Sequence, residues 1–168
     1  KQPSVVVVVP TYNERPNIEA LILGVLELDP RYRVVVVDDG SPDGTGALAD
    51  ALAAVHPGRV EVIHRTAKGG LGPAYVAGFR RALKLAPDLI AQMDADLSHD
   101  PAALPALVSA VEHGADLAMG SRYVPGGRVT NWGRVRLALS RVGNAYARFC
   151  LGIGVHDALR DDTYPAPP

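Results

Sequence analysis

The first forty residues change from a strand-like pattern to a helix-like pattern and back. Val5–Val9 and Val34–Val37 are uninterrupted runs of valine, and such runs are typical of strands buried on both faces of a sheet. Between them, apolar residues recur every three or four positions, and Pro16 stands where the first turn of a helix accepts proline. The recurring positions are Ile18, Leu21, Ile22, Val25 and Leu26. The pattern predicts a strand, a helix and a second strand.

The same alternation continues to residue 120. It predicts helices at Gly44–Val55, Gly72–Leu85 and Pro101–His113. It predicts strands at Val60–His64, Leu89–Met93 and Asp116–Gly120. Regular alternation of this kind favours an α/β fold. We expect a doubly wound, mostly parallel sheet with helices on both faces.

Polar residues directly follow three of the predicted strands. Pro10–Glu14 comes after the first strand, Asp38–Thr45 after the second and Asp94–Asp96 after the fourth. The carboxyl ends of parallel strands meet at one edge of a sheet, and the ligands of such sheets bind there. We therefore expect the three segments to form one site.

Length, composition and charge fit one globular domain without a nucleic-acid partner. The chain has 168 residues, of which 48% are hydrophobic and 21% charged, as is typical of a chain that folds around a single core. Its 17 Lys and Arg against 18 Asp and Glu leave a net charge of −1. This balance argues against a protein that holds nucleic acid through bulk positive charge.

Cysteine usage and hydropathy indicate the cellular compartment and the kind of membrane contact. Cys150 is the one cysteine of the sequence, which excludes an internal disulfide and a cysteine-based zinc site and favours a reducing compartment. No apolar stretch approaches the roughly 20 residues that span a bilayer, and Lys1–Ser4 lacks the layout of a signal peptide. We expect a cytoplasmic protein whose membrane contacts are peripheral.

Asp94 and Asp96 are the strongest candidates for a metal site. They end an apolar strand with one residue between them, so in extended geometry both carboxylates point to the same side. A hard cation such as Mg²⁺ or Mn²⁺, held together with phosphate oxygens of a substrate, would neutralise their repulsion. The alternative is that Asp96 is a solvated loop residue, while Asp100 caps the helix that begins at Pro101.

Asp39 follows the second buried strand in a turn rich in glycine and proline. A carboxylate in this place is able to accept hydrogen bonds from a nucleobase or a ribose. The structural alternative for this turn is that Asp43 or Thr45 caps the next helix. We expect nucleotide contact for Asp39 and capping for Asp43.

Basic side chains near the same edge allow two interpretations each. Lys68 precedes a glycine-rich segment, but no Walker sequence follows, so we expect mainly a structural entry to the next helix, with direct ligand contact as the alternative. Arg122 follows the fifth predicted strand, and its guanidinium suits phosphate; an ion pair with Asp116 is the alternative. We expect His99 to be a polar loop residue.

Five segments, taken together, resemble the motifs of family 2 glycosyltransferases, and among them those of the polyprenol-phosphate (dolichol-phosphate) mannose synthases. The segments are VVVPTYNE, VVVVDDGSPDGT, AKGGLGPAY, MDADLSHDP and GSRYVPGG, and the resemblance covers about residues 4–157. It implies a GT-A fold, with a Rossmann-like sheet. It also implies transfer of mannose from GDP-mannose to polyprenyl (dolichyl) phosphate on the cytosolic face of a membrane.

The resemblance further implies roles for single residues. Those that border the guanine nucleotide would be Pro10, Tyr12, Glu14, Val37 and Asp39. Asp94 and Asp96 would hold the metal and the diphosphate, with Ala95 contributing backbone. Arg122 would contact phosphate, and Ser98 stands where some relatives have a further ligand, a glutamine.

The C-terminal part has a different character. Residues 122–151 contain six arginines and no acidic residue. Helical spacing gathers apolar side chains on one face with arginines beside it, at Val135, Leu139, Val142, Tyr146, Phe149, Arg134, Arg141 and Arg148. This is the layout of an interfacial helix, and a surface helix packed on the sheet is the alternative. We expect a nucleotide-sugar-binding core over residues 1–122 and a basic, acceptor-side region over residues 123–168.

After Asp157 the sequence departs from the family. The relatives continue with a segment similar to D.TSGFR, whereas here Ala158–Asp162 and a proline-rich end follow. We expect the acceptor side to be incomplete. Two alternatives to the mannosyltransferase interpretation stay open. One is a related enzyme that uses another donor such as UDP-glucose, and the other is a non-catalytic module that binds nucleotide and metal.

Overall fold

The computed structural model describes residues 3–66 and 68–120. The chain divides into two compact units, residues 1–105 and residues 106–168, and the sheet lies in the first. The division expected at residue 122 falls outside the described residues and stays a prediction. Within the described part, no helix combines the length and the apolar character that crossing a bilayer requires.

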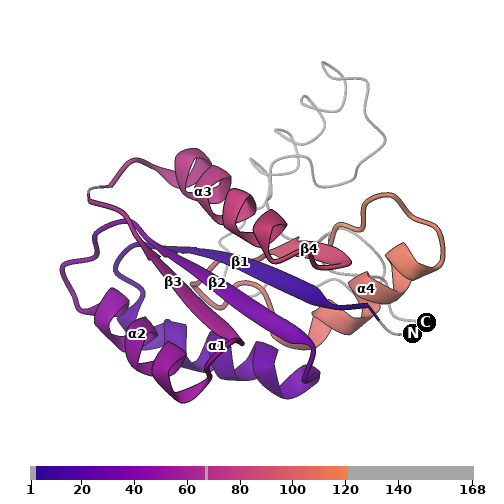
Figure 1. Cartoon of the computed structure of the whole chain (residues 1–168), viewed down its shortest axis with the longest axis horizontal. Coiled ribbons are helices and arrows are strands. Elements are labelled where there is room, and N and C mark those ends of the chain that lie inside the picture. Colours follow the sequence, from indigo (N-terminus) through magenta and orange to yellow (C-terminus); the bar gives the residue numbers. More distant parts are fainter. Residues whose placement is uncertain (1–2, 67, 121–168) are drawn as a thin grey trace, which may run out of the picture. The chain divides into compact units, whose positions relative to one another are not determined.

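The sheet has four parallel strands, and their order reverses at the first one. They are β1 (Val5–Thr11), β2 (Tyr32–Asp38), β3 (Val60–His64) and β4 (Leu89–Gln92), arranged as β3-β2-β1-β4 (Figure 1). In the register of β1, Val7 lies opposite Val34 of β2 on one side and Ala91 of β4 on the other. The chain thus leaves β1 toward β2 and later returns to its other side. Such a reversal is the point where doubly wound sheets bind their ligands.

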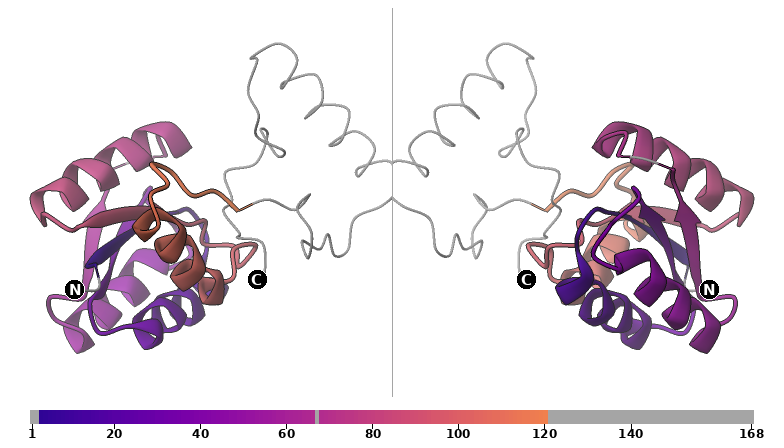
Figure 2. Two further views of the ribbon diagram at one scale, coloured as in Figure 1. Left: turned by 90° about the vertical axis from the view of Figure 1, so that its right-hand side faces the viewer. Right: turned by 90° about the vertical axis from the view of Figure 1, so that its left-hand side faces the viewer.

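Helices cover both faces of the sheet, as the sequence predicts. α1 (Arg15–Leu28) and α2 (Thr45–Val55) pack on one face, and α3 (Leu71–Lys84) packs on the other (Figure 2). A short 3₁₀ helix, η1 (Pro101–Ala103), leads into α4 (Leu104–Glu112). The predicted doubly wound α/β fold is therefore confirmed, with helix ends that differ from the predicted ones by at most three residues.

The valine runs form the core because side chains of a strand alternate between the two faces of a sheet. All seven residues of β1 are buried. Val6 and Val8, with Val35 and Val37 of β2, pack on the α3 side, where they join Ala74, Tyr75 and Ala82. Burying one such valine contributes roughly 1.5 kcal/mol or more. The two layers of helices leave the carboxyl ends of these strands as the open edge.

The strand predicted at Asp116–Gly120 is absent, and this prediction was wrong. Every strand pairing among the described residues belongs to β1–β4, while Leu117 is 72% and Met119 40% exposed. A strand needs a neighbour that accepts and donates its ladder hydrogen bonds. The prediction rested on the apolar character of this short segment alone, which does not supply that neighbour.

Candidate functional site

A pocket of about 280 Å³ opens at the carboxyl ends of β1, β2 and β4. This volume lies near the lower limit for pockets that hold small molecules. All three polar segments expected at this edge contribute to it, together with the start of α3. The lining residues are Pro10, Thr11, Tyr12, Glu14, Asp39, Lys68, Gly70, Leu71, Ala74, Asp94, Ala95 and Asp96.

Most of the residues expected to bind the donor line this pocket. Val37 lies at the end of β2 with its side chain buried in the core beneath α3, so it stands behind the pocket and not in its wall. Arg122 and the basic segment that follows it lie outside the described residues. Nothing in the structure therefore tests the roles expected for them.

The loops after β1 and β2 are bonded to each other. The backbone N–H of Asn13 donates to the hydroxyl of Ser41 at 3.0 Å, and that of Glu14 donates to the hydroxyl of Thr45 at 3.0 Å. The carbonyl of Glu14 then accepts from Ile18 in the first turn of α1, at 2.9 Å. These bonds fix the backbone beside Tyr12, so the pocket wall after β1 is held by the turn after β2.

Asp43 joins the first turns of two helices. Its Oδ1 accepts from the backbone N–H and the hydroxyl of Thr45, at 2.9 and 2.6 Å, and its Oδ2 accepts from the backbone N–H of Arg15 at 3.1 Å. The hydrogen bond from the Thr45 hydroxyl is the largest cause of a lowered pKa of Asp43; burial opposes it, and the bonds from the backbone N–H groups of Thr45 and Arg15 lower the pKa further. The cap residue of α2 is Gly44, with φ 89°. Asp43 thus stabilises the start of α2, as expected, although it stands one residue before the N-cap position.

Asp39 holds the glycine-rich segment that leads into α3. Its side chain is buried, and its Oδ2 accepts from the backbone N–H groups of Gly69 and Gly70, at 2.9 and 3.1 Å. Its Oδ1 pairs with the guanidinium of Arg65. Gly70 has φ 91° and ψ 168°, a conformation that is essentially restricted to glycine. The carboxylate expected to contact a nucleotide is thus already fixed in place by the loop on the other side of the pocket.

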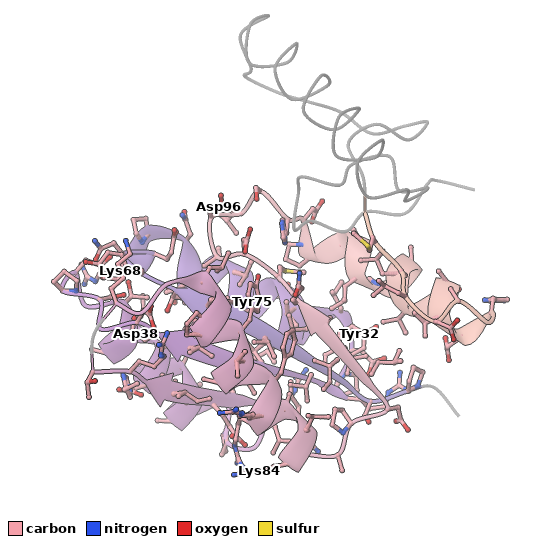
Figure 3. All side chains as sticks on the ribbon, turned by 90° about the horizontal axis from the view of Figure 1, so that it is seen from above. Tyr32, Asp38, Lys68, Tyr75, Lys84 and Asp96 are labelled. Atoms are coloured by element: carbon pink, nitrogen blue, oxygen red, sulfur yellow. The ribbon has the colours of Figure 1, made fainter. Side chains whose placement is uncertain are left out.

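Lys68 brings a positive charge into a pocket that is otherwise acidic. Its Nζ lies 4.0 Å from the centre of the Tyr12 ring, within the range of a cation–π contact. Figure 3 shows Lys68 and Asp96 near the first turn of α3, with Lys84 at the far end of this helix. The sequence left ligand contact by Lys68 as an alternative, and the structure places its ammonium group where an anion in the pocket would be attracted.

The two aspartates after β4 lie in different environments. The hydroxyl of Tyr75 donates to Oδ1 of Asp94 at 2.9 Å, and His99 contacts the same residue. Asp96 is exposed, and its Oδ1 accepts from the backbone N–H of Ser98 at 2.9 Å. Both carboxylates line the pocket, so the structure brings together the pair that the sequence singled out.

His99 is the residue whose environment differs most from expectation. It lies in a loop, as predicted, but its side chain is 2% exposed. The chain reverses at Leu97, which has φ 58°, and the reversal returns the imidazole to Asp94. Tyr75 and His99 are the contacts of the predicted site that the sequence did not reveal. A left-handed leucine has no clear signal in a sequence, whereas the cap that Asp100 provides to η1 through Ala102, at 2.9 Å, was predicted.

The donor set fits a magnesium or manganese ion that is shared with a substrate. Among the described residues, no group of three or more His, Cys, Asp and Glu side chains is placed to hold a metal. The pocket instead offers two carboxylates, Asp94 and Asp96. Mg²⁺ and Mn²⁺ are typically bound by one or two carboxylates, with phosphate oxygens and water at the other positions.

Comparisons with known proteins agree on the family. The model of the family described as Glycosyl transferase family 2 matches residues 6–161. Polyprenol monophosphomannose synthase of Mycolicibacterium smegmatis is 56% identical over 90% of this chain, which corresponds to 57% of that protein. Undecaprenyl-phosphate mannosyltransferase of Micrococcus luteus is 46% identical over 96% of this chain and 68% of that protein. The chain thus spans between about half and two thirds of the length of these relatives.

Solved structures show the same fold. A mannosyltransferase of Pyrobaculum calidifontis, in complex with GDP-Man and Mn²⁺, is 33% identical with a TM-score of 0.54, over 71% of this chain and 34% of that one. Glucosyl-3-phosphoglycerate synthase of Mycobacterium tuberculosis, in complex with Mn²⁺, UDP-glucose and phosphoglyceric acid, aligns over 95% of this chain and 55% of that one. Its TM-score is 0.66 at 24% identity, so it supports the fold alone.

Proposed function

Because the chain belongs to glycosyltransferase family 2, we propose that it transfers mannose from GDP-mannose to a polyprenyl phosphate with the help of Mg²⁺ or Mn²⁺. The observation that carries this proposal is the pocket at the reversal of strand order, which Asp94 and Asp96 line together with Lys68 and Tyr12. The names of the relatives support the sugar and the acceptor. The Pyrobaculum enzyme in complex with GDP-Man and Mn²⁺ supports the donor and the metal.

In this proposal the nucleotide lies along the ends of β1 and β2. Pro10, Tyr12, Glu14 and Asp39 surround the guanosine, with Val37 packed in the core behind them. The diphosphate extends toward Asp94, Ala95 and Asp96, which hold the metal ion. Arg122 contributes a further phosphate contact.

The residues near the diphosphate balance its negative charge and orient the donor. A bound divalent ion would neutralise the charge that develops on the departing diphosphate, and the ammonium of Lys68 adds a second positive charge. An oxygen of the lipid phosphate attacks the anomeric carbon of mannose, and the bond from this carbon to GDP breaks, so that GDP leaves with the electron pair. A phosphate monoester has its second pKa near 6. The nucleophile is therefore already ionised at neutral pH and needs no strong base.

A lipid acceptor places the reaction at a membrane surface, on its cytosolic side. The basic segment after Trp132 supports peripheral attachment, because the amphipathic helix that its sequence predicts would suit the boundary between acyl chains and anionic headgroups. In liposome flotation, we expect binding to anionic vesicles that weakens as salt rises. Failure of the folded protein to float with such vesicles at low salt would contradict membrane attachment.

A transfer assay tests the proposed function. The protein is incubated with Mn²⁺, polyprenyl phosphate and either GDP-[¹⁴C]mannose or UDP-[¹⁴C]glucose, and the label in the lipid fraction is counted. We expect mannose to be transferred, glucose not to be transferred, and a chelator to stop the reaction. Transfer of glucose alone would identify another donor. Binding of GDP-mannose without any transfer would identify a non-catalytic module.

A further inference from the structure

Tyr75 restrains Asp94 from the side of α3. Its hydroxyl donates to Oδ1 of Asp94 at 2.9 Å, and the residue is 8% exposed. Its ring stacks on Phe79, with centroids 5.7 Å apart and planes inclined by 19°. A phenol held in this way has little freedom to turn, so the hydroxyl reaches the carboxylate from a fixed position. Figure 3 shows Tyr75 in the helix that begins at the pocket.

His99, which follows Asp94 in the sequence, contacts the same residue from the loop after β4. The backbone N–H of Asp94 donates to Nδ1 of His99 at 3.0 Å, and a nitrogen that accepts this bond carries no hydrogen. The hydrogen of the imidazole in this arrangement is on Nε2. Nε2 lies 3.6 Å from Oδ2 of Asp94, which is longer than a hydrogen bond but close enough for an N–H on this nitrogen to attract the second carboxylate oxygen.

The two aspartates of the pair are therefore not equivalent. Oδ1 of Asp94 accepts a hydrogen bond from the buried Tyr75, and Oδ2 lies 3.6 Å from Nε2 of the buried His99, so both contacts favour one orientation of the carboxylate. Asp96 is exposed, and its Oδ1 bonds to the backbone of the next turn. A carboxylate that is already oriented loses less conformational freedom when it binds a cation. Groups that orient metal ligands without touching the metal typically change metal affinity by about tenfold or more.

We propose that Tyr75 and His99 are positioning residues, which fix the Asp94 carboxylate in the orientation that binds the metal ion and the donor diphosphate. This inference rests on the proposed function. Neither residue lines the pocket, so both act through Asp94 and not through contact with the donor. Asp94 is then the preset ligand of the pair, and Asp96 completes the site from its exposed turn.

Substitutions separate this positioning role from a role in stability. Tyr75→Phe removes the hydroxyl and keeps the ring that stacks on Phe79. His99→Ala removes both nitrogens, whereas His99→Asn keeps an acceptor near the position of Nδ1. Tyr32→Phe is the matched control, because Tyr32 is also a buried tyrosine, 5% exposed, but begins β2 at the end opposite the pocket (Figure 3).

The readout is binding of GDP by the full chain with Mn²⁺ and with a chelator, measured by calorimetry, together with free Mn²⁺ measured by electron paramagnetic resonance. We expect Tyr75→Phe and His99→Ala each to weaken Mn²⁺-dependent GDP binding by roughly tenfold and to leave GDP binding in chelator unchanged. His99→Asn should recover part of the loss, and Tyr32→Phe should match the wild type. Thermal melts identify any variant that does not fold. If His99→Ala fails to fold, the binding data for Tyr75→Phe and His99→Asn still test the positioning role.

The outcomes distinguish this inference from the proposed function. If Mn²⁺ does not strengthen GDP binding to the wild type, the proposed function and this inference are both overturned. If it does, and Tyr75→Phe and His99→Ala bind Mn²⁺ and GDP as the wild type does, the inference alone is overturned. Loss of GDP binding in chelator to the same extent as with Mn²⁺ would also overturn it, since a structural role would affect both.

Nitrogen-15 spectroscopy supplies a signature that does not depend on any ligand. The imidazole of His99 should show a hydrogen on Nε2 and none on Nδ1, and the amide of Asp94 should exchange faster in His99→Ala than in His99→Asn. A hydrogen on Nδ1 of the wild-type imidazole would contradict the contact from which the inference starts.

Discussion

Asp38, Asp39 and Asp43 lie in one short segment, yet their carboxylates have three different functions. Asp38 is buried and accepts from the hydroxyl of Thr11 at 3.3 Å and the backbone N–H of Ser41 at 3.2 Å. Asp39 holds the segment before α3, and Asp43 joins the starts of α1 and α2. Residue type alone does not separate these functions, because each depends on which N–H groups the turn directs at the carboxylate.

The lowered pKa of Asp43 makes its contribution to stability depend on pH. Because the folded state favours the ionised form, this stabilisation is present above the ordinary pKa of 3.8 and is lost as the pH falls through the lower pKa of the folded protein. We expect Asp43→Ala to lower the free energy of unfolding near pH 7, and the difference from the wild type to shrink in strong acid. Urea denaturation of the wild type and Asp43→Ala, near pH 7 and in strong acid, measures the difference in the free energy of unfolding.

The exposed Asp116 provides the control for that measurement, since Asp116→Ala should leave the free energy of unfolding nearly unchanged. A deficit of Asp43→Ala that is as large in strong acid as near pH 7 would show that the ionised carboxylate is not the source of the stabilisation.

The site was predictable where a short segment determines the contact. Asp94 and Asp96 follow a buried strand, and Asp100 precedes a proline, so the pair and the cap are both legible in the sequence. The contacts of Tyr75 and His99 with Asp94 were not predictable, because they depend on how α3 packs on the sheet and on the left-handed turn at Leu97.

At the scale of elements, the sequence located all four strands of the sheet, and the clearest signal came from the two with an uninterrupted β-branched run. β1 and β2 were found because burial on both faces requires apolar residues at every position, although β2 begins two residues earlier, at Tyr32. The segment Asp116–Gly120 has a weaker version of the same pattern and no partner strand among the described residues. Apolar character is necessary for a buried strand, but pairing decides whether it forms.

The packing of α3 on the sheet depends on Gly78. A Cβ at this position would lie 2.2 Å from Cγ1 of Val8 and 3.1 Å from Cγ2 of Val37, so the helix would have to move away from the sheet. We expect Gly78→Ala to lower the free energy of unfolding by about 1–3 kcal/mol, measured by urea denaturation. Because α3 also carries Tyr75 and Ala74, the same shift should weaken ligand binding at the pocket.

Gly72 lies in the same helix and serves as the control. No heavy atom lies within 4 Å of a Cβ built there, so we expect Gly72→Ala to change the free energy of unfolding by less than about 1 kcal/mol. Equal effects of the two substitutions would mean that the close approach to Val8 does not limit the packing of α3.

At the scale of the whole molecule, the strand order indicates where a doubly wound sheet would bind a ligand, and a pocket lies at that place. The strand order β3-β2-β1-β4 places the reversal beside β1, and the pocket opens there between residues that come from four segments distant in the sequence. The matched relatives are longer than this chain, which spans 57% of the Mycolicibacterium enzyme and 68% of the Micrococcus enzyme. Binding of the donor is therefore the part of the proposed reaction that the described residues address most directly.

The central measurement is calorimetric titration of GDP-mannose with and without Mn²⁺ into the wild type and Asp96→Asn. Asparagine keeps the shape of the side chain and removes the charge that a metal ion requires. Asp100→Asn is the control, because an asparagine oxygen is also able to accept the capping bond from Ala102. We expect Mn²⁺ to strengthen binding to the wild type and to Asp100→Asn by about tenfold or more and to have little effect on Asp96→Asn. Equal affinity of the wild type with and without Mn²⁺, or an unchanged response in Asp96→Asn, would contradict a metal-dependent donor site in this pocket.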